Sequence, residues 1–243
     1  MEYRLKRVLK NKKCLVTGAS RGIGRSIVRN LLEVGAVVIA TASQQKNLKA
    51  LKHEFSQYGE NLIIFDADLS VNEEVQHLCR LISSEVGDVD VLINNAGILC
   101  LESLENSTEE MLRKSFEVNY FSAFTLCRHF SPAMIKNNRG DIVNMCSSSA
   151  YTGGGAANHS IYASTKHALL GLSRALDEEL RSYNIRVATV SPAGVSTEMM
   201  TGRVDLDHSS FMTPDEVADA VMYLLQSDGA GIVYEMRMWR KDR

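Results

Sequence analysis

The sequence is poor in the features that usually mark domain boundaries. Only three of its 243 residues are proline, and no Pro-rich or Gly/Ser-rich linker, low-complexity tract or repeat of fixed period interrupts it. Residues 1–243 are therefore predicted to form a single domain. Because 45% of the residues are hydrophobic, the chain has enough apolar side chains for a sizeable core.

Long apolar runs and an excess of charge are also missing. No run approaches the roughly 18 residues that a membrane-spanning helix needs, so no membrane span is expected. The N-terminal segment MEYRLKRVLKNKK is basic but lacks the apolar centre of a signal peptide. The net charge of −2 gives no general attraction to nucleic acid or to an anionic membrane. The basic C-terminal sequence MWRKDR is interpreted as a solvated tail, with a binding patch as the less favoured alternative.

Cysteine and histidine show no pattern of disulfide or metal binding. The five cysteines are odd in number, scattered and never arranged as a CxxC pair. They are interpreted as reduced thiols, and Cys14, Cys100 and Cys146 fall in or at the ends of predicted strands. This usage is typical of a cytoplasmic protein. The six histidines lack metal-ligand spacing, so no metal site is predicted.

The chain does contain a regular alternation of apolar and amphipathic segments. Apolar segments typical of buried strands occupy residues 13–18, 36–42, 61–67, 89–97, 140–147, 185–192 and 232–239. Amphipathic segments typical of helices occupy residues 24–35, 44–59, 72–87, 108–136, 160–183 and 213–227. A capping box from Ser107 to Glu110 is expected to start the long helix at 108–136. Strands that are apolar throughout are covered on both faces, which predicts an α/β fold with a doubly wound parallel sheet.

In such a sheet, ligands bind beyond the carboxyl ends of the strands. Residues 17–24, TGASRGIG, follow the first predicted strand and lead into the first helix. The glycines allow backbone N–H groups to approach a pyrophosphate, and the helix adds its positive end. The spacing is G-x3-G-x-G rather than the commoner G-x-G-x-x-G, yet its position favours nucleotide binding over a purely structural turn. The predicted binding residues of this turn are Gly18, Ser20, Arg21, Gly22, Ile23 and Gly24.

The segment after the second predicted strand lacks a carboxylate. Residues 37–46, VVIATASQQK, contain no Asp or Glu, whereas a fold that prefers NAD usually offers one to the ribose 2′-hydroxyl. Arg21, Ser43 and Lys46 can meet a 2′-phosphate with charge and hydrogen bonds. NADP(H) is therefore predicted in preference to NAD(H). The alternative is that Arg21 and Lys46 are only solvated surface charges.

Polar residues also follow the third and fourth predicted strands. Asp68, followed by Leu69, stands where a carboxylate accepts a hydrogen bond from an adenine amino group, although it equally suits a cap for the following helix. Asn94 and Asn95 end the next strand, where side-chain amides either contact a cofactor or satisfy backbone groups.

Six motifs in order then resemble the short-chain dehydrogenase/reductase family, in its single-domain form. They are TGASRGIG, NNAG, VNY, IVNMCS, YASTK and SPAGVST, and they extend from about Lys12 to the last predicted strand. The resemblance implies a Rossmann-type sheet of seven parallel strands in a three-layer α/β/α arrangement, and a small-molecule carbonyl or alcohol substrate. It also implies a homodimer or homotetramer formed through the two long helices. Its cofactor residues would further include Asn95, Ala96, Gly97, Pro192, Val195 and Thr197.

The YASTK motif carries the predicted acid–base chemistry. Tyr162 and Lys166 are four residues apart, which places both side chains on one face of a helix. The pKa of a phenol is about 10, and a nearby ammonium is expected to lower it so that Tyr162 exchanges a proton with substrate. The resemblance adds that Lys166 holds the nicotinamide ribose and that Asn119 anchors a water in a proton relay.

The resemblance also implies a catalytic serine, and two spacings usual in the family place it at different residues. Counting three residues from Asn144 in the strand gives Ser147, whereas counting back thirteen from Tyr162 gives Ser149. The end of a strand is geometrically fixed while a loop absorbs insertions, so Ser147 is preferred as the group that stabilises the substrate oxygen. The resemblance supports this choice, because relatives often have a glycine six residues after the serine, where Gly153 lies, and GGGAANHS would then carry a two-residue insertion.

The remaining motif and the substrate cover are less regular. Ala193 occupies the place of the usual glycine in SPAGVST, so the local turn is expected to differ. Residues 198–212 are expected to cover a small or medium substrate, with Met199, Met200 and Phe211 as an adaptable apolar wall. The C-terminal segment is not expected to complete the substrate site. A dinucleotide-binding regulatory or scaffold protein without turnover is the alternative function, and an epimerase or dehydratase is disfavoured.

Overall fold

The computed structural model describes residues 7–151, 157–200, 210–228 and 231–240. Within them, seven strands form one sheet in the order β3-β2-β1-β4-β5-β6-β7, and all neighbouring strands are parallel. The strands are β1 Lys13–Thr17, β2 Val37–Ala42, β3 Leu62–Asp66, β4 Val91–Asn94, β5 Gly140–Met145, β6 Ile185–Pro192 and β7 Glu235–Met238. The predicted Rossmann-type α/β fold is confirmed.

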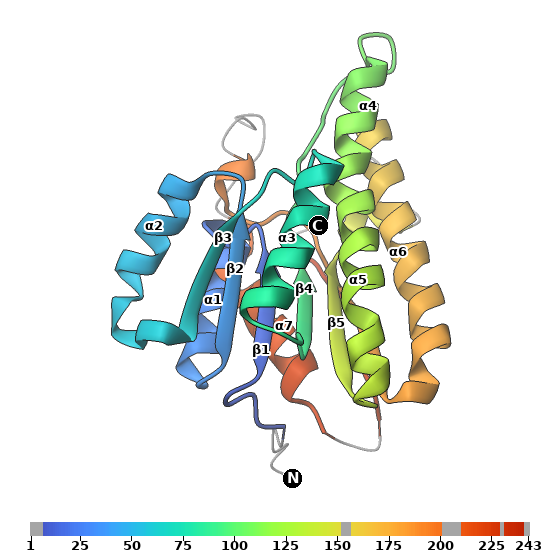
Figure 1. The fold of residues 1–243 in the computed structure, drawn as a ribbon. Helices are drawn as coiled ribbons and strands as arrows, with labels where there is room; N and C mark the ends of the chain where they lie inside the picture. Colours follow the sequence, from blue (N-terminus) through green and yellow to red (C-terminus); the bar gives the residue numbers. More distant parts are fainter. Residues whose placement is uncertain (1–6, 152–156, 201–209, 229–230, 241–243) are drawn as a thin grey trace.

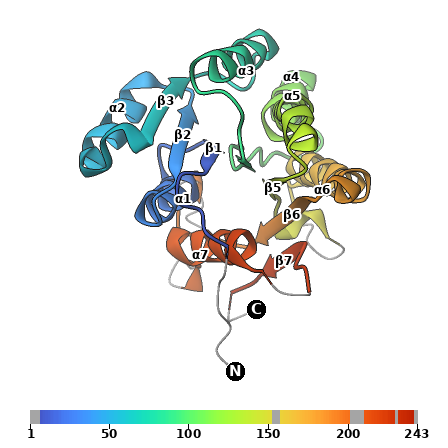
Figure 2. The ribbon, with the colours of Figure 1, turned by 60° about the horizontal axis from the view of Figure 1, so that its bottom comes forward.

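Helices cover both faces of the sheet, as Figures 1 and 2 show. One face carries α1 Gly22–Glu33, α2 Gln45–Glu54 and α7 Pro214–Gln226, and the other carries α3 Asn72–Glu85, α4 Glu109–Phe116, α5 Ser122–Lys136 and α6 Ser160–Leu180. Two large apolar clusters fill the space between sheet and helices, one on each face. This burial on both sides explains why the strand sequences are apolar throughout. No helix in the described residues is both long and apolar enough to cross a membrane.

The strand register brings the carboxyl ends of the central strands to one edge. Thr17 of β1 pairs with Thr41 of β2, and Asn94 of β4 pairs with Asn144 of β5. The topology reverses between β1 and β4, because β2 and β3 lie on one side of β1 and the later strands on the other. This switch in strand order is where a doubly wound sheet forms a crevice for its ligand.

The predicted helix at 108–136 is not one regular helix. A π-helical turn, Glu117–Phe121, separates α4 from α5. The expected capping box at Ser107 is also wrong, because the Thr108 side chain accepts the hydrogen bond from the Met111 N–H at 3.2 Å. Ser107 instead donates to the Ser103 carbonyl oxygen at 2.7 Å. The π turn holds Asn119, and such turns occur frequently at functional sites.

Candidate functional site

A cleft of about 1010 Å³ opens at the carboxyl edge of the sheet, and its walls come from loops that follow the strands. The predicted cofactor residues all line it, namely Gly18, Ser20, Arg21, Gly22, Ile23, Gly24, Ser43, Asp68, Leu69, Asn95, Ala96, Gly97, Tyr162, Lys166, Pro192, Val195 and Thr197. Ser147 and Ser149 line it as well. Lys46, Asn94 and Asn119 are not part of its lining.

The glycine-rich turn forms one end of the cleft through close backbone packing. Gly18 has a φ of +62°, and a Cβ there would lie 2.8 Å from the Cα of Ala96. A Cβ on Gly24 would lie 2.1 Å from the Gly18 carbonyl oxygen and 2.6 Å from the Asn95 side-chain nitrogen. The Asn95 amide donates to the carbonyl oxygens of Thr17 and Gly18 at 2.9 and 3.1 Å, which fixes the turn against β4. Asn95 therefore satisfies backbone groups, as one of the two predicted roles requires, and it also lines the cleft.

The first helix presents its N-terminus to this end of the cleft. Its N-cap residue, Arg21, makes no capping hydrogen bond through its side chain, and Gly22 and Ile23 line the cleft. By contrast, the first turns of α4 and α7 are capped by the side chains of Thr108 and Thr213. The first-turn N–H groups of α1 therefore fit an anionic ligand such as a pyrophosphate, for which the glycine turn leaves room.

The groups expected at a 2′-phosphate are exposed. Arg21 forms an ion pair with Glu198 at 3.0 Å, and both side chains are more than half exposed, at 66% and 60%. A pair of this kind contributes little to stability, so Arg21 is free to exchange Glu198 for another anion. Ser43 lines the cleft beside the end of β2, whereas Lys46 is exposed outside it.

The two predicted polar residues after β3 and β4 differ in role. The Asp68 carboxylate accepts from the N–H and the hydroxyl of Ser70, at 2.9 and 2.7 Å, and these bonds hold its pKa below the usual value. It lines the cleft and does not cap α3, whose N-cap is Val71. Asn94 is buried and donates to the side-chain oxygen of Asn144 at 2.8 Å, so it ties β4 to β5.

Tyr162 and Lys166 project from the first two turns of α6 into the cleft, as predicted from their spacing. The Lys166 Nζ donates to the Met145 carbonyl oxygen at 2.9 Å and lies 5.8 Å from the Tyr162 ring centroid. Burial lowers the pKa of Lys166, and burial raises the pKa of Tyr162 to about 12. The expected lowering of the Tyr162 pKa is therefore wrong, because the cost of burying a phenolate outweighs the effect of its neighbours.

Of the two candidate serines, Ser147 is the one whose hydroxyl affects the pKa of Tyr162. The Ser147 hydroxyl lowers the pKa of Tyr162, although by less than burial raises it. The Ser147 oxygen accepts from the Ser149 N–H at 3.1 Å, which fixes its position at the start of a short 3-10 turn, Ser148–Ala150. Ser149 also lines the cleft, and it is not among the groups that shift the pKa of Tyr162. Gly153, and with it the expected insertion, lies outside the described residues.

Asn119 is buried beside this group without reaching the cleft surface. Its side-chain oxygen accepts from the Ile98 N–H at 2.8 Å, and its nitrogen donates to the Ile98 carbonyl at 3.0 Å and to the Thr165 hydroxyl at 3.0 Å. Thr165 in turn donates to the Tyr162 carbonyl at 2.8 Å. A Cβ on Gly97 would lie 3.3 Å from the Asn119 oxygen and 3.4 Å from Lys166 Nζ, so these polar groups approach the same backbone. The Asn119 side chain thus connects the loop after β4 to the helix that carries Tyr162.

The loop after β6 accepts alanine at the position of the usual glycine. Ala193 does not adopt a positive φ, and its N–H donates to the Met238 carbonyl oxygen at 2.9 Å. Val195 pairs with Met212 in an isolated parallel bridge. Ala193 is therefore held by β7 in a conformation that tolerates a side chain, and Val195 and Thr197 still line the cleft.

The C-terminal segment contradicts two expectations. Arg237, Trp239 and Arg240 line the cleft, so the described part of the basic C-terminal segment is not simply a solvated tail and forms part of the cleft wall. Met236 and Met238 pack against the core, while Arg237 between them does not, but a strand of four residues is too short for this alternation to be recognised in the sequence.

The expected substrate cover is described in part. Met199, Met200 and Phe211 line the cleft as an apolar wall. Arg203, Asp205 and Asp207 lie outside the described residues. Lys114 and His159 also line the cleft and were not foreseen, because neither follows a strand or belongs to a motif. Within the described ranges, no group of three or more His, Cys, Asp or Glu residues is placed to hold a metal ion.

Comparisons with known proteins agree with this geometry. The family model for short chain dehydrogenases matches residues 12–206. The 3-oxoacyl-(acyl-carrier-protein) reductase FabG of Escherichia coli is 34% identical over 234 residues, which cover 92% of this chain and 93% of that protein. An L-xylulose reductase of Caenorhabditis elegans is 36% identical over 239 residues, covering 91% of each chain. A solved metagenomic short-chain oxidoreductase in complex with NADP is 29% identical, with a TM-score of 0.83 over 97% of this chain and 100% of that one.

Proposed function

The chain belongs to the short chain dehydrogenase family, and from that premise we propose that it is an NADP(H)-dependent oxidoreductase acting on a small or medium carbonyl compound or secondary alcohol. The observation that carries this proposal is the meeting of Ser147, Tyr162 and Lys166 in one cleft with an uncapped helix N-terminus and a glycine turn. The turn fits the pyrophosphate of a dinucleotide, and the tyrosine fits proton exchange with a substrate oxygen.

In the reducing direction, NADPH supplies the hydride when it is bound. Tyr162 is protonated at neutral pH because burial raises its pKa to about 12, so it enters the reaction as an acid. It gives its proton to the substrate oxygen as negative charge develops there. Ser147, whose oxygen is already fixed by the Ser149 N–H, donates its hydroxyl hydrogen to the same oxygen. In the oxidising direction Tyr162 accepts the proton from the alcohol.

Lys166 and Asn119 hold this arrangement in place. We assign Lys166, which is buried against the Met145 carbonyl, to the cofactor ribose and to the orientation of Tyr162. We assign Asn119 to the support of the proton relay, since its amide connects Ile98 to Thr165 and through Thr165 to the backbone of Tyr162. Both roles rest on contacts at the base of the cleft rather than on its exposed rim.

The preference for NADP(H) over NAD(H) rests on the second strand and on Arg21. Residues 37–46 contain no carboxylate to repel a 2′-phosphate, and Arg21 and Ser43 line the cleft near this strand end. The solved relative that binds NADP supports the same assignment. Two further parts of the proposal are a cytoplasmic location, in keeping with five unpaired cysteines, and a homodimer or homotetramer. Partly exposed Met111, Leu112 and Phe121 on the α4–α5 segment supply apolar area for such an interface.

The test is a titration with NADPH and NADH followed by reduction of a panel of ketones and aldehydes. We expect tighter binding of NADPH and turnover that falls by about 100-fold or more in Tyr162→Phe, because that change removes only the proton donor. Because the variant keeps the ring of Tyr162 and loses only its hydroxyl, the Kd for NADPH should rise by less than about 10-fold. Tight cofactor binding without turnover of any carbonyl, and indifference to Tyr162→Phe, would instead establish the regulatory or scaffold alternative.

A further inference from the structure

We propose that the substrate carries an anionic group, a carboxylate or a phosphate, that is bound by Arg237 and Arg240 at the C-terminal end of the cleft. This inference rests on the proposed function and names the substrate class of that same site. Both arginines line the cleft and come from β7 and the residues after it. Guanidinium groups bind carboxylates and phosphates through paired N–H donors, which gives both charge and geometry.

The two arginines lie at the substrate end of the cleft. In the register of β6 and β7, Arg237 pairs with Ser191, and Met238 pairs with Pro192, which itself lines the cleft. Arg240 lies over the ring of Phe211, with its guanidinium carbon 5.3 Å from the ring centroid. Because Phe211 belongs to the apolar wall expected to cover the substrate, Arg240 is placed at that wall rather than at the glycine turn.

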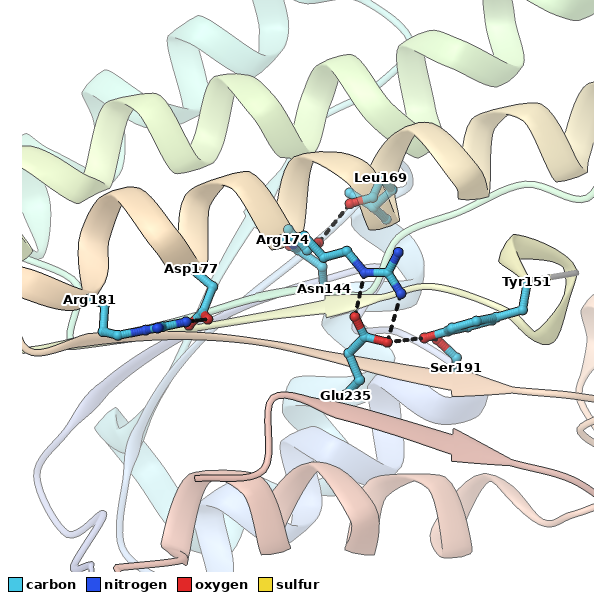
Figure 3. Close-up of polar contacts among 9 residues, drawn as sticks. Asn144, Tyr151, Leu169, Arg174, Asp177, Arg181, Ser191 and Glu235 are labelled. Carbon is cyan, nitrogen blue, oxygen red and sulfur yellow. Dashed lines mark hydrogen bonds and ion pairs between the residues drawn. The ribbon is translucent and has the colours of Figure 1, made fainter. Parts of the chain in front are cut away.

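Glu235, the carboxylate in β7 two residues before Arg237, already accepts hydrogen bonds from other residues. Figure 3 shows Glu235 held by Arg174, whose Nε and Nη2 donate at 2.5 and 3.1 Å, and by the Tyr151 hydroxyl at 3.1 Å. The Arg174 hydrogen bond is the largest cause that holds the pKa of Glu235 below its usual value, and the charge of Arg237 adds a smaller lowering, so the hydrogen-bonded counter-ion of Glu235 is Arg174. Neither Arg237 nor Arg240 forms an ion pair with any residue in the described parts of the chain.

Both guanidinium groups lie over aromatic rings at cation–π distance. The guanidinium carbon of Arg237 lies 4.1 Å from the centroid of Tyr151, and that ring is itself fixed by its bond to Glu235. Stacking occupies the face of a guanidinium and leaves its N–H donors in the plane for an anion. Arg240 donates once, to the Ser210 hydroxyl at a long 3.4 Å, so most of its donors are also unused by described residues.

Among the described residues that line the cleft, no carboxylate forms an ion pair with Arg237 or Arg240. Of the lining carboxylates, Glu198 is paired with Arg21 and Asp68 is bonded to Ser70. Lys166 is buried against a backbone carbonyl. The described residues at the C-terminal end of the cleft therefore carry positive charge on two arginines that lie over aromatic rings, and the complementary substrate is a carbonyl compound with an anionic end.

The experiment compares matched anionic and neutral substrates in the full chain. An oxo carboxylate, its methyl ester and an oxo phosphate of similar length are reduced with NADPH. The wild type should prefer an anion over the ester, and the ratio of the two anions identifies which one the site takes. Arg237→Gln and Arg240→Gln should each raise KM for that anion about 10-fold, with little change in kcat and less than about 2-fold change for the ester. Arg113→Gln, at an exposed pair outside the cleft, is the control.

A binding experiment tests the anion site independently of whether the protein is an active reductase. Calorimetry measures binding of the matched hydroxy acid, hydroxy phosphate and hydroxy ester to the protein saturated with NADP⁺, which needs no turnover. Weaker binding of the acid or phosphate in Arg237→Gln, with ester binding unchanged, supports the inference even if no carbonyl is reduced. Equal affinity for anion and ester, or an equal loss for both in the arginine variants, overturns it while leaving an active reductase unaffected.

Discussion

The two ends of the cleft are built in different ways. At the glycine turn, backbone atoms pack so closely that a Cβ on Gly24 would lie 2.1 Å from the Gly18 carbonyl oxygen. At the C-terminal end, long side chains such as Arg237 and Arg240 stand on aromatic rings and remain partly exposed. Backbone packing fixes a shape that tolerates no substitution, whereas exposed side chains can be exchanged without moving the strand beneath them. The first end suits a cofactor of constant shape and the second suits selection among substrates.

Gly24→Ala is the most direct test of whether the glycine turn is as rigid as its close packing indicates. The added methyl group meets backbone and a fixed amide, so the turn has to move, and we expect the Kd for NADPH to rise by more than about 100-fold. Fluorescence titration with NADPH and thermal unfolding measure the two effects. Gly171→Ala in α6 is the matched control, because a Cβ there meets nothing within 4 Å, and it should be as stable as wild type or slightly more so. Normal NADPH binding by Gly24→Ala would show that the turn is not rigid.

Ser147→Ala tests the centre of the cleft, where its two ends meet. We expect kcat to fall by about 100-fold, because one hydrogen bond to the developing oxyanion is lost. Ser149→Ala should lower kcat by less than about 3-fold, since only Ser147 acts on Tyr162. Steady-state kinetics at saturating NADPH separate the two variants. Loss of turnover only in Ser149→Ala would transfer the assignment to that residue.

Arg21→Ala sharpens the comparison, because it is an exposed side chain at the backbone-built end. Its ion pair with Glu198 contributes little to folding, so the melting temperature should not change measurably. The Kd for NADPH should rise about 10-fold while that for NADH stays constant. Lys46→Ala, outside the cleft lining, should alter neither constant by more than about 2-fold. Equal weakening of NADPH and NADH would mean that Arg21 does not contact the 2′-phosphate.

The smallest expected effect is the response of reduction to pH. Tyr162 must be protonated to act as an acid, and its pKa of about 12 keeps it so throughout the neutral range. The kcat/KM for reduction, which reports the free enzyme, should vary less than about 2-fold between pH 6 and pH 9. Alcohol oxidation needs the deprotonated phenol and should increase as pH rises over the same range. A decline of reduction with a midpoint near neutral pH would contradict the raised pKa.

Residues whose position depends on the end of a strand could be predicted from the sequence. Apolar runs locate strands, and parallel strands end at one edge, so the sequence predicts that Ser147, Asn95 and the glycine turn lie together at this edge. Tyr162 and Lys166 followed from helical spacing. The family comparisons confirm this fold, while the roles of these residues remain predictions.

Features that depend on tertiary contacts could not be predicted in this way. Arg237 belongs to a strand of four residues, too short for its alternation to stand out from a basic tail. The raised pKa of Tyr162 comes from burial, which neither its neighbours in sequence nor its spacing to Lys166 reveals. The π turn around Asn119 is stabilised by the backbone of Ile98 and by Thr165, both distant in sequence.

Because of that π turn, the orientation of α4 relative to α5 depends on the exact number of residues between them. Each residue of a helix advances the chain by about 100° around the axis, so one residue removed from Glu117–Phe121 would turn α4 against α5 by about that angle. The shortened segment would form a more regular helix, and helix propensity taken alone would therefore predict that the deletion is stabilising. Yet Asn119 could no longer face Ile98 and Thr165 together. Single-residue deletions in this segment should therefore be far less tolerated than substitutions, and designed shortening of the protein has to avoid it.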